Sequence, residues 1–180
     1  MTNFFIKLKR EIFPIGLIFI LILAKLIPHS PNFTPIIAAA MLSGYFFKNI
    51  YLSFLTLLIS MLLADAFIGF YNNMFFVYSS LFLITFIFFK ISKQINYKNL
   101  FVYSFVASLI FFIISNFGVW VLESPGAYNV PYEKNLEGLI ECYVMAIPFF
   151  RNTLLSSIIF SYSTFFAFNI FENRFSKKFS

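Results

Sequence analysis

The sequence predicts an all-α polytopic membrane protein, a single domain of residues 1–180 with six transmembrane helices. Hydrophobic residues make up 61% of the chain and charged residues only 11%, and a water-soluble domain of this size could not cover its surface with that composition. Apolar segments alternate with short polar connections, and the length leaves room for about six spans of roughly 20 residues. We expect these spans at residues 12–27, 35–47, 50–70, 74–91, 100–122 and 136–171.

The first span follows a basic segment that contains Lys7, Lys9 and Arg10. A basic start followed by an apolar run is also how a secretory signal peptide begins. No small-x-small cleavage site follows the run where one would be expected. We therefore expect an uncleaved first span.

The connection between the first two spans, residues 26–35, is predicted to be a stiff loop. Prolines stand at positions 28, 31 and 35, and proline lacks the backbone N–H and drives the preceding residue toward extended geometry. A helix cannot continue through this segment. The loop carries His29, Asn32 and Phe33, which we interpret as candidate substrate-binding residues; the alternative for the single histidine is an exposed polar side chain.

The second span is short, so it is either tilted or begins inside the proline loop. Its small residues include Ala40 and Gly44, four positions apart. This spacing lets two membrane helices approach closely. The partner is either another helix of this chain or a helix of a second protein.

The third span contains a carboxylate, Asp65, one to two turns from its outer end. A charge at that depth costs free energy unless it is paired, hydrated or protonated, which makes Asp65 a candidate site residue. The last span contains Arg151, and an Asp65–Arg151 pair would neutralise both groups. Such a pair would serve either the structure or the substrate.

The fifth span carries Asn116 and Trp120 four residues apart, and so on one helical face. We interpret both as lining a cavity open to the outside, which Asn72, Asn73 and Tyr78 would close from the neighbouring spans. Two simpler explanations stay open. Trp120 near the membrane boundary is typical of an interfacial anchor, and outer turns are often rich in asparagine for backbone reasons.

The distribution of basic residues predicts the orientation, because short cytoplasmic loops are enriched in lysine and arginine. With the N-terminus in the cytoplasm, the inner side holds Lys7, Lys9, Arg10, Lys48, Lys90, Lys93, Lys98, Arg174, Lys177 and Lys178. Only Lys25, Lys134 and Arg151 lie elsewhere. We expect a multi-pass protein of the bacterial cytoplasmic (inner) membrane with both termini in the cytoplasm.

Several classes of function are not expected. The basic residues adjoin apolar spans and form no single patch, so nucleic acid is not a predicted partner. One membrane aspartate and one loop histidine provide neither of the pairs that intramembrane proteolysis needs, and we expect no enzyme. His29 and Cys142 are far apart in sequence, and we assign neither a metal site nor a cofactor.

Several segments together resemble a known family. They are residues 26–35, residues 38–41, Asp65 with Gly69 and Phe70, residues 116–120, and residues 138–155. Over about residues 24–160 the chain looks like a family of small, uncharacterised bacterial six-span proteins assigned to transport. That family is more loosely similar to the substrate-binding S components of energy-coupling factor (ECF) transporters, which are six-helix bundles.

The resemblance implies capture of a micronutrient, of the vitamin or metal-ion class, from the outer side. It also implies an ATPase-driven energising module as a partner. S components commonly carry an Ala-x-x-x-Ala docking motif in the first span, where this chain has Gly16, Ile20 and Ala24. A transporter that works alone is therefore an open alternative.

The main hypothesis is a substrate-binding membrane protein for micronutrient uptake, in contact with the lipid bilayer and a small-molecule ligand. The alternative is a non-transporting membrane scaffold of the cell-shape (rod complex) type. A scaffold needs no inward polar residues in its outer half, and this chain has several, so transport is favoured.

Overall fold

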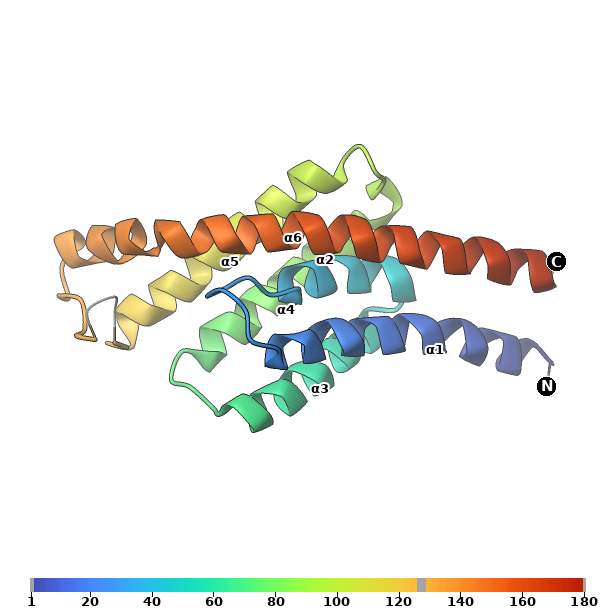
Figure 1. Ribbon diagram of the computed structural model, residues 1–180, viewed down its shortest axis with the longest axis horizontal. Coiled ribbons are helices and arrows are strands. Elements are labelled where there is room, and N and C mark those ends of the chain that lie inside the picture. The colour runs from blue at the N-terminus through green and yellow to red at the C-terminus, as the bar shows by residue number, and fades with distance from the viewer. Residues whose placement is uncertain (1, 126–128, 180) are drawn as a thin grey trace.

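The computed structural model describes residues 2–125 and 129–179, and the side chains of residues 11–125 and 129–175. Every regular element in these residues is helical (Figure 1). The helices are α1 (Thr2–Leu23), α2 (Ile36–Phe47), α3 (Ile50–Ile68), α4 (Met74–Lys90), α5 (Leu100–Val121) and α6 (Leu136–Phe179), with short 3-10 helices η1 (Ala24–Leu26) and η2 (Ser92–Gln94). The predicted all-α class is confirmed.

Four of the six helices lie close to the predicted spans, whereas α1 begins at Thr2, ten residues before the predicted first span of residues 12–27, and ends at Leu23. Helices α2 to α5 begin and end within two residues of the ranges that the sequence indicates. The last helix is longer than expected, since it continues to Phe179 without a break. Among the described residues three helices are long and apolar enough to cross a membrane, namely Ile50–Ile68, Leu100–Val121 and Leu136–Phe175, and α2 and α4 are apolar but shorter. The chain is a multi-pass membrane protein.

Helix α2 lies at the centre of the bundle. It contacts α1, α3, α4, α5 and α6, and every residue of the helix except Tyr45 is buried. A helix that is apolar on all sides is expected to be buried. The remaining helices are packed around α2, and their outward faces carry exposed apolar side chains such as Leu55, Ile59 and Phe105, which are suited to contact lipid.

Small residues allow α4 to approach α2 closely. A Cβ atom on Gly44 would lie 2.8 Å from the backbone nitrogen and Cα of Phe89. One turn earlier, the Thr85 hydroxyl donates a hydrogen bond of 3.0 Å to the carbonyl of Ala40. The Ala40–Gly44 spacing therefore serves packing within this chain, the first of the two alternatives that the sequence left open.

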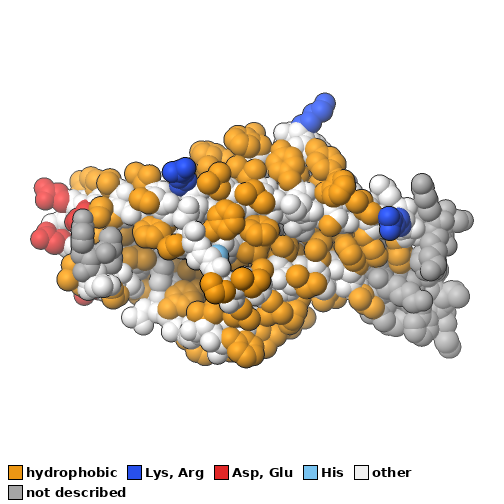
Figure 2. All heavy atoms as spheres, in the orientation of Figure 1, with side chains coloured by type: hydrophobic (Ala, Val, Ile, Leu, Met, Phe, Trp, Pro, Cys, Tyr) orange, Lys and Arg blue, Asp and Glu red, His pale blue; other side chains and the backbone are white. Residues whose placement is uncertain are grey.

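The two ends of the bundle differ in character. Both termini lie at one end, which we call the terminal end, together with the α2–α3 connection at Lys48 (Figure 1). The opposite end, which we call the loop end, carries the α3–α4 turn and the α5–α6 connection. Acidic side chains gather at the loop end, while apolar side chains cover the middle of the visible face (Figure 2).

The close contact at Gly44 leads to a stability prediction. We expect Gly44→Ala to cost about 1–3 kcal/mol of folding free energy, because the new methyl group would press on backbone that cannot rotate away. Gly16→Ala is the matched control, since nothing lies within 4 Å of a Cβ at Gly16 and its effect should stay within about 0.5 kcal/mol. The measurement is the thermal unfolding midpoint in detergent; equal midpoints for the two variants would contradict the prediction.

Candidate functional site

The proline loop, of which residues 27–35 follow η1, is held to α6 by a hydrogen bond and an aromatic contact. The side-chain amide of Asn152 on α6 donates a 2.9 Å hydrogen bond to the carbonyl of Pro31. The ring of Phe33 lies edge-on to that of Phe160, 6.1 Å between centroids. Asn32 at the turn adopts a left-handed backbone conformation, φ 60°, which asparagine tolerates better than most residues. The turn thereby presents the Asn32 side chain toward the bundle.

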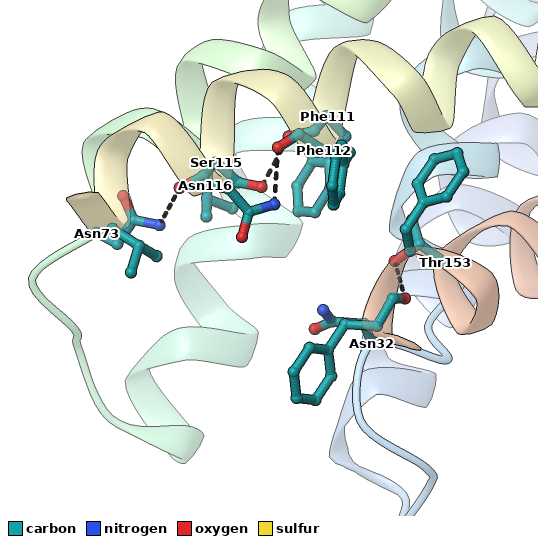
Figure 3. A pocket seen from close by; sticks show the side chains of 11 residues that line it. Asn32, Asn73, Phe111, Phe112, Ser115, Asn116 and Thr153 are labelled. Carbon is teal, nitrogen blue, oxygen red and sulfur yellow. Dashed lines mark hydrogen bonds between the residues drawn. The ribbon is translucent and has the colours of Figure 1, made fainter. Parts of the chain in front are cut away.

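A cavity of about 190 Å³ lies where this turn meets α4, α5 and α6. It is lined by Asn32, Asn73, Val77, Phe111, Phe112, Ser115, Asn116, Val119, Phe149, Phe150 and Thr153. Figure 3 shows Asn116 on α5 and Asn32 on the loop directed toward the same space. The described lining combines neutral polar groups with aromatic rings and contains no charged side chain. We call it the asparagine pocket.

Hydrogen bonds to the backbone orient the polar side chains of the asparagine pocket. The Asn116 Nδ2 group donates to the carbonyl of Phe112 at 2.7 Å. The hydroxyl of Ser115 donates to Phe111 at 2.7 Å, and that of Thr153 donates to Phe149 at 3.0 Å. A carbonyl oxygen only accepts hydrogen bonds. The Nδ2 atom of Asn116 therefore faces its own helix, and the Oδ1 atom faces the pocket.

Asn73 joins the start of α4 to α5. Its Nδ2 group donates a 2.8 Å hydrogen bond to the carbonyl of Ser115. Its Oδ1 atom is buried without a hydrogen-bond partner and packs on Gly118, where a Cβ would lie only 2.0 Å away. Glycine at position 118 is therefore needed for this approach of the two helices, which forms one wall of the pocket.

Asp65 lies outside the asparagine pocket, and its partner is not Arg151. The carboxylate has 0% exposure and forms a salt bridge with Lys25 in η1. It also accepts a 2.8 Å hydrogen bond from the hydroxyl of Tyr78 on α4. This network joins η1, α3 and α4 near the loop end.

The α3–α4 connection completes the surroundings of this network. The Lys25 ammonium lies 5.8 Å from the ring centroid of Tyr71. Burial raises the pKa of the Tyr71 hydroxyl, and the nearby Asp65 carboxylate raises it further. The phenol therefore stays protonated at neutral pH.

The pairing of Asp65 with Arg151 is a wrong expectation. Arg151 is exposed on α6 and makes no hydrogen bond or salt bridge with the described part of the chain. Of the three basic residues that the sequence places away from the inner side, Lys25 is the one whose ammonium reaches the buried carboxylate, and its side chain is 16% exposed.

The other predicted site residues divide into two groups. Asn32 and Asn116 line the asparagine pocket. His29 and Asn72 are exposed, and the His29 Nδ1 atom contacts the carbonyl of Ile27. None of His29, Asn72, Phe33 and Trp120 is among the described residues that line the pocket.

Trp120 acts as an anchor for the α5–α6 connection. Its indole N–H donates a 2.9 Å hydrogen bond to the carbonyl of Glu133. The ammonium of Lys134 lies 5.2 Å from the centroid of the indole. Residues 126–128 of the same connection lie outside the described residues. The structure thus assigns Trp120 a role in holding this loop to the end of α5.

Sequence reasoning did not identify most of the pocket. It missed Val77, Phe111, Phe112, Ser115, Val119, Phe149, Phe150 and Thr153. The chain has 30 phenylalanines, so nothing in the sequence distinguishes the four that line a cavity. Ser115 and Thr153 carry a detectable signal, because a polar residue within an apolar span is expected to face the bundle.

A second cavity of about 350 Å³ lies at the terminal end. It is lined by Tyr45, Lys48, Ser92, Lys93, Phe168 and Glu172. Lys48 directly follows the last residue of α2. A cation at this position is favoured by the negative end of the helix dipole. The lining of this cavity comes from α2, the residue that follows it, η2 and α6, and it includes the charged residues Lys48, Lys93 and Glu172, whereas the described lining of the asparagine pocket is uncharged.

Comparison with known protein families matches residues 6–178 to a family described as a family of unknown function, DUF6580. No curated protein and no solved structure matches the chain. Within the described residues no three His, Cys, Asp or Glu side chains are grouped so that they could hold a metal ion.

The Asp65 network leads to a stability prediction. Lys25→Met should cost about 3–5 kcal/mol, because it leaves a fully buried carboxylate without its counter-ion. Asp65→Asn should cost less, since Lys25 can turn toward water, and the double variant Lys25→Met with Asp65→Asn should recover most of the loss. The measurement is a double-mutant cycle of unfolding midpoints in detergent.

Arg151→Met is the control for this cycle. It should leave the midpoint unchanged, because the arginine contacts no acidic group among the described residues. A loss for Arg151→Met together with no loss for Lys25→Met would restore the pairing that the sequence suggested.

Proposed function

Since the chain belongs to the DUF6580 family, whose function is unknown, we propose a function from the site itself. The protein is an integral membrane protein that binds a small organic micronutrient at the asparagine pocket and serves its uptake. The loop end faces the outside and the terminal end faces the cytoplasm. All six helices take part in crossing the membrane, in a bundle of the ECF S-component type.

The proposed orientation rests on charge. The described basic residues at the terminal end include Lys48, Lys90 and Lys93, whereas the segment 123–141 near the loop end contains four glutamates. Lysine and arginine near the ends of spans are retained on the cytoplasmic side. With the terminal end in the cytoplasm of a bacterial cell, the asparagine pocket belongs to the outer half of the bundle.

The observation that carries the proposal is the irregular backbone of the proline loop beside the pocket. Helix α2 has 12 residues, or about 18 Å, against a hydrocarbon core of about 30 Å. The proline loop must supply the missing depth. Non-helical backbone at membrane depth is tolerated where it is buried in protein or lines a water-filled cavity, and the turn at Asn32 lines the cavity.

The contacts of the loop suggest how a ligand enters. Few bonds hold it against α6: the amide of Asn152 and the edge contact of Phe33. Their opening would expose the asparagine pocket, and their closure over a ligand would separate the ligand from outside water. Release toward the cytoplasm by ATP hydrolysis requires an energising partner, as the resemblance to S components implies.

The proposal predicts that a bound ligand stabilises the protein and that its binding depends on Asn116. Protein purified in mild detergent should retain a small organic molecule, identified by mass spectrometry, and excess of that molecule should raise the unfolding midpoint. Asn116→Ala should lose most of the retained molecule because the pocket loses a polar contact worth about 1–3 kcal/mol.

Asn72→Ala is the matched control, because Asn72 is an exposed asparagine outside the pocket. Retention should be unchanged in this variant. If the parent protein retains no molecule and vitamins and metal ions leave its midpoint unmoved, the uptake proposal fails and the membrane scaffold becomes the better explanation.

A further inference from the structure

The free hydrogen-bond donors and acceptors of the asparagine pocket are unevenly distributed over its walls. The hydroxyl hydrogens of Ser115 and Thr153 are both used by carbonyl groups of their own helices, so each hydroxyl oxygen can only accept further bonds. The Asn116 Nδ2 group is held by the carbonyl of Phe112, which leaves the Oδ1 acceptor directed toward the pocket (Figure 3). Acceptors therefore predominate on the walls of α5 and α6.

The amide donors that remain lie mainly on Asn32 in the proline loop, with one N–H each on Asn73 and Asn116. The Asn73 Nδ2 group is bound to the carbonyl of Ser115, and each bound amide nitrogen keeps one N–H. Asn32 contributes the one side chain of the described lining whose amide makes no hydrogen bond within the described chain. A ligand that brings its own N–H or O–H donors satisfies the free acceptors of α5 and α6, whereas a ligand that brings only acceptors leaves them unpaired, which is costly for the buried side chains of Ser115 and Thr153.

The aromatic lining and the charge around the pocket favour positive charge on the ligand. Phe111, Phe112, Phe149 and Phe150 are among the lining residues, and the faces of aromatic rings attract cations. The described lining contains no lysine or arginine that would repel a cation. The segment 123–151 carries four glutamates against Lys134 and Arg151, a net negative field that raises the local concentration of cations.

The volume limits the enclosed part of the ligand. A cavity of about 150 Å³ with apolar walls takes up benzene, so the 190 Å³ of the asparagine pocket suits one ring with a short polar substituent. A molecule with several fused rings would not be enclosed.

We propose that the asparagine pocket recognises a single-ring organic cation or amine through its N–H donors. This inference rests on the uptake function proposed above and names the chemical class of the ligand. The donors would reach Asn116 Oδ1 and the Ser115 and Thr153 oxygens, and the ring would lie among the phenylalanines.

Three probes with the same number of non-hydrogen atoms test the class: benzamidine, a cation with donors only; benzamide, neutral with donors and one acceptor; and benzoate, an anion with acceptors only. Calorimetric titration of the purified protein in detergent should give the tightest binding for benzamidine. We expect a dissociation constant about tenfold or more below that of benzoate, with benzamide between them. Equal or tighter binding of benzoate would overturn the inference.

Asn116→Asp sharpens the test, because it replaces the amide by a negative acceptor at the same position. Benzamidine should bind more tightly to this variant and benzoate more weakly. Asn72→Asp adds the same charge on the exposed turn and should change both constants by less than about twofold, because an exposed charge is screened by salt. Equal effects of the two variants would attribute the preference to long-range charge and not to the pocket.

The molecule retained on purification separates failure of the ligand class from failure of uptake. A retained, Asn116-dependent anion or a molecule without N–H or O–H donors would overturn the class and leave the uptake function standing. A retained amine or organic cation supports both. If no molecule is retained and none of the three probes binds, both proposals fall together.

Discussion

Every backbone polar group that lies within a bilayer must find its partner inside the protein, and this constraint shapes the bundle. Helix α2 meets it through its own backbone hydrogen bonds and is surrounded by five other helices. The chain before α2 cannot be helical because of its prolines; residues 26–32 are exposed, whereas Thr34 and Pro35 are buried. The asparagine pocket lies where this non-helical segment meets α4, α5 and α6.

Close contacts between helices turn the space at this meeting point into a defined cavity. Gly44 brings α4 against α2, and Gly118 brings the start of α4 against α5. The hydroxyls of Ser115 on α5 and Thr153 on α6 donate hydrogen bonds to carbonyls in the preceding turn of their own helices. Such bonds remove the cost of polar groups in an apolar setting and leave the oxygen lone pairs available.

Much of the fold could be predicted from the sequence, because the apolar runs and the proline loop mark where helices begin and end. Asn32 was singled out for its place in the proline loop and Asn116 for the helical face that it shares with Trp120, and both line the asparagine pocket. The partner of Asp65 could not be predicted, because the sequence places both Lys25 and Arg151 away from the inner side and only the packing of η1 against α3 decides between them. The phenylalanines of the pocket could not be predicted either, because phenylalanine is suited both to positions that face lipid and to positions that line an apolar cavity.

Helix α6 is continuous over 44 residues, about 66 Å at 1.5 Å per residue, and so it is roughly twice as long as the hydrocarbon core is thick. Phe149, Phe150 and Thr153 lie in its first half, and Phe168 and Glu172 line the cavity at the terminal end. The helix continues through Pro148. A small tilt of α6 about its contacts with α2 would displace its two ends in opposite directions, so that a change at the asparagine pocket would alter the cavity at the terminal end.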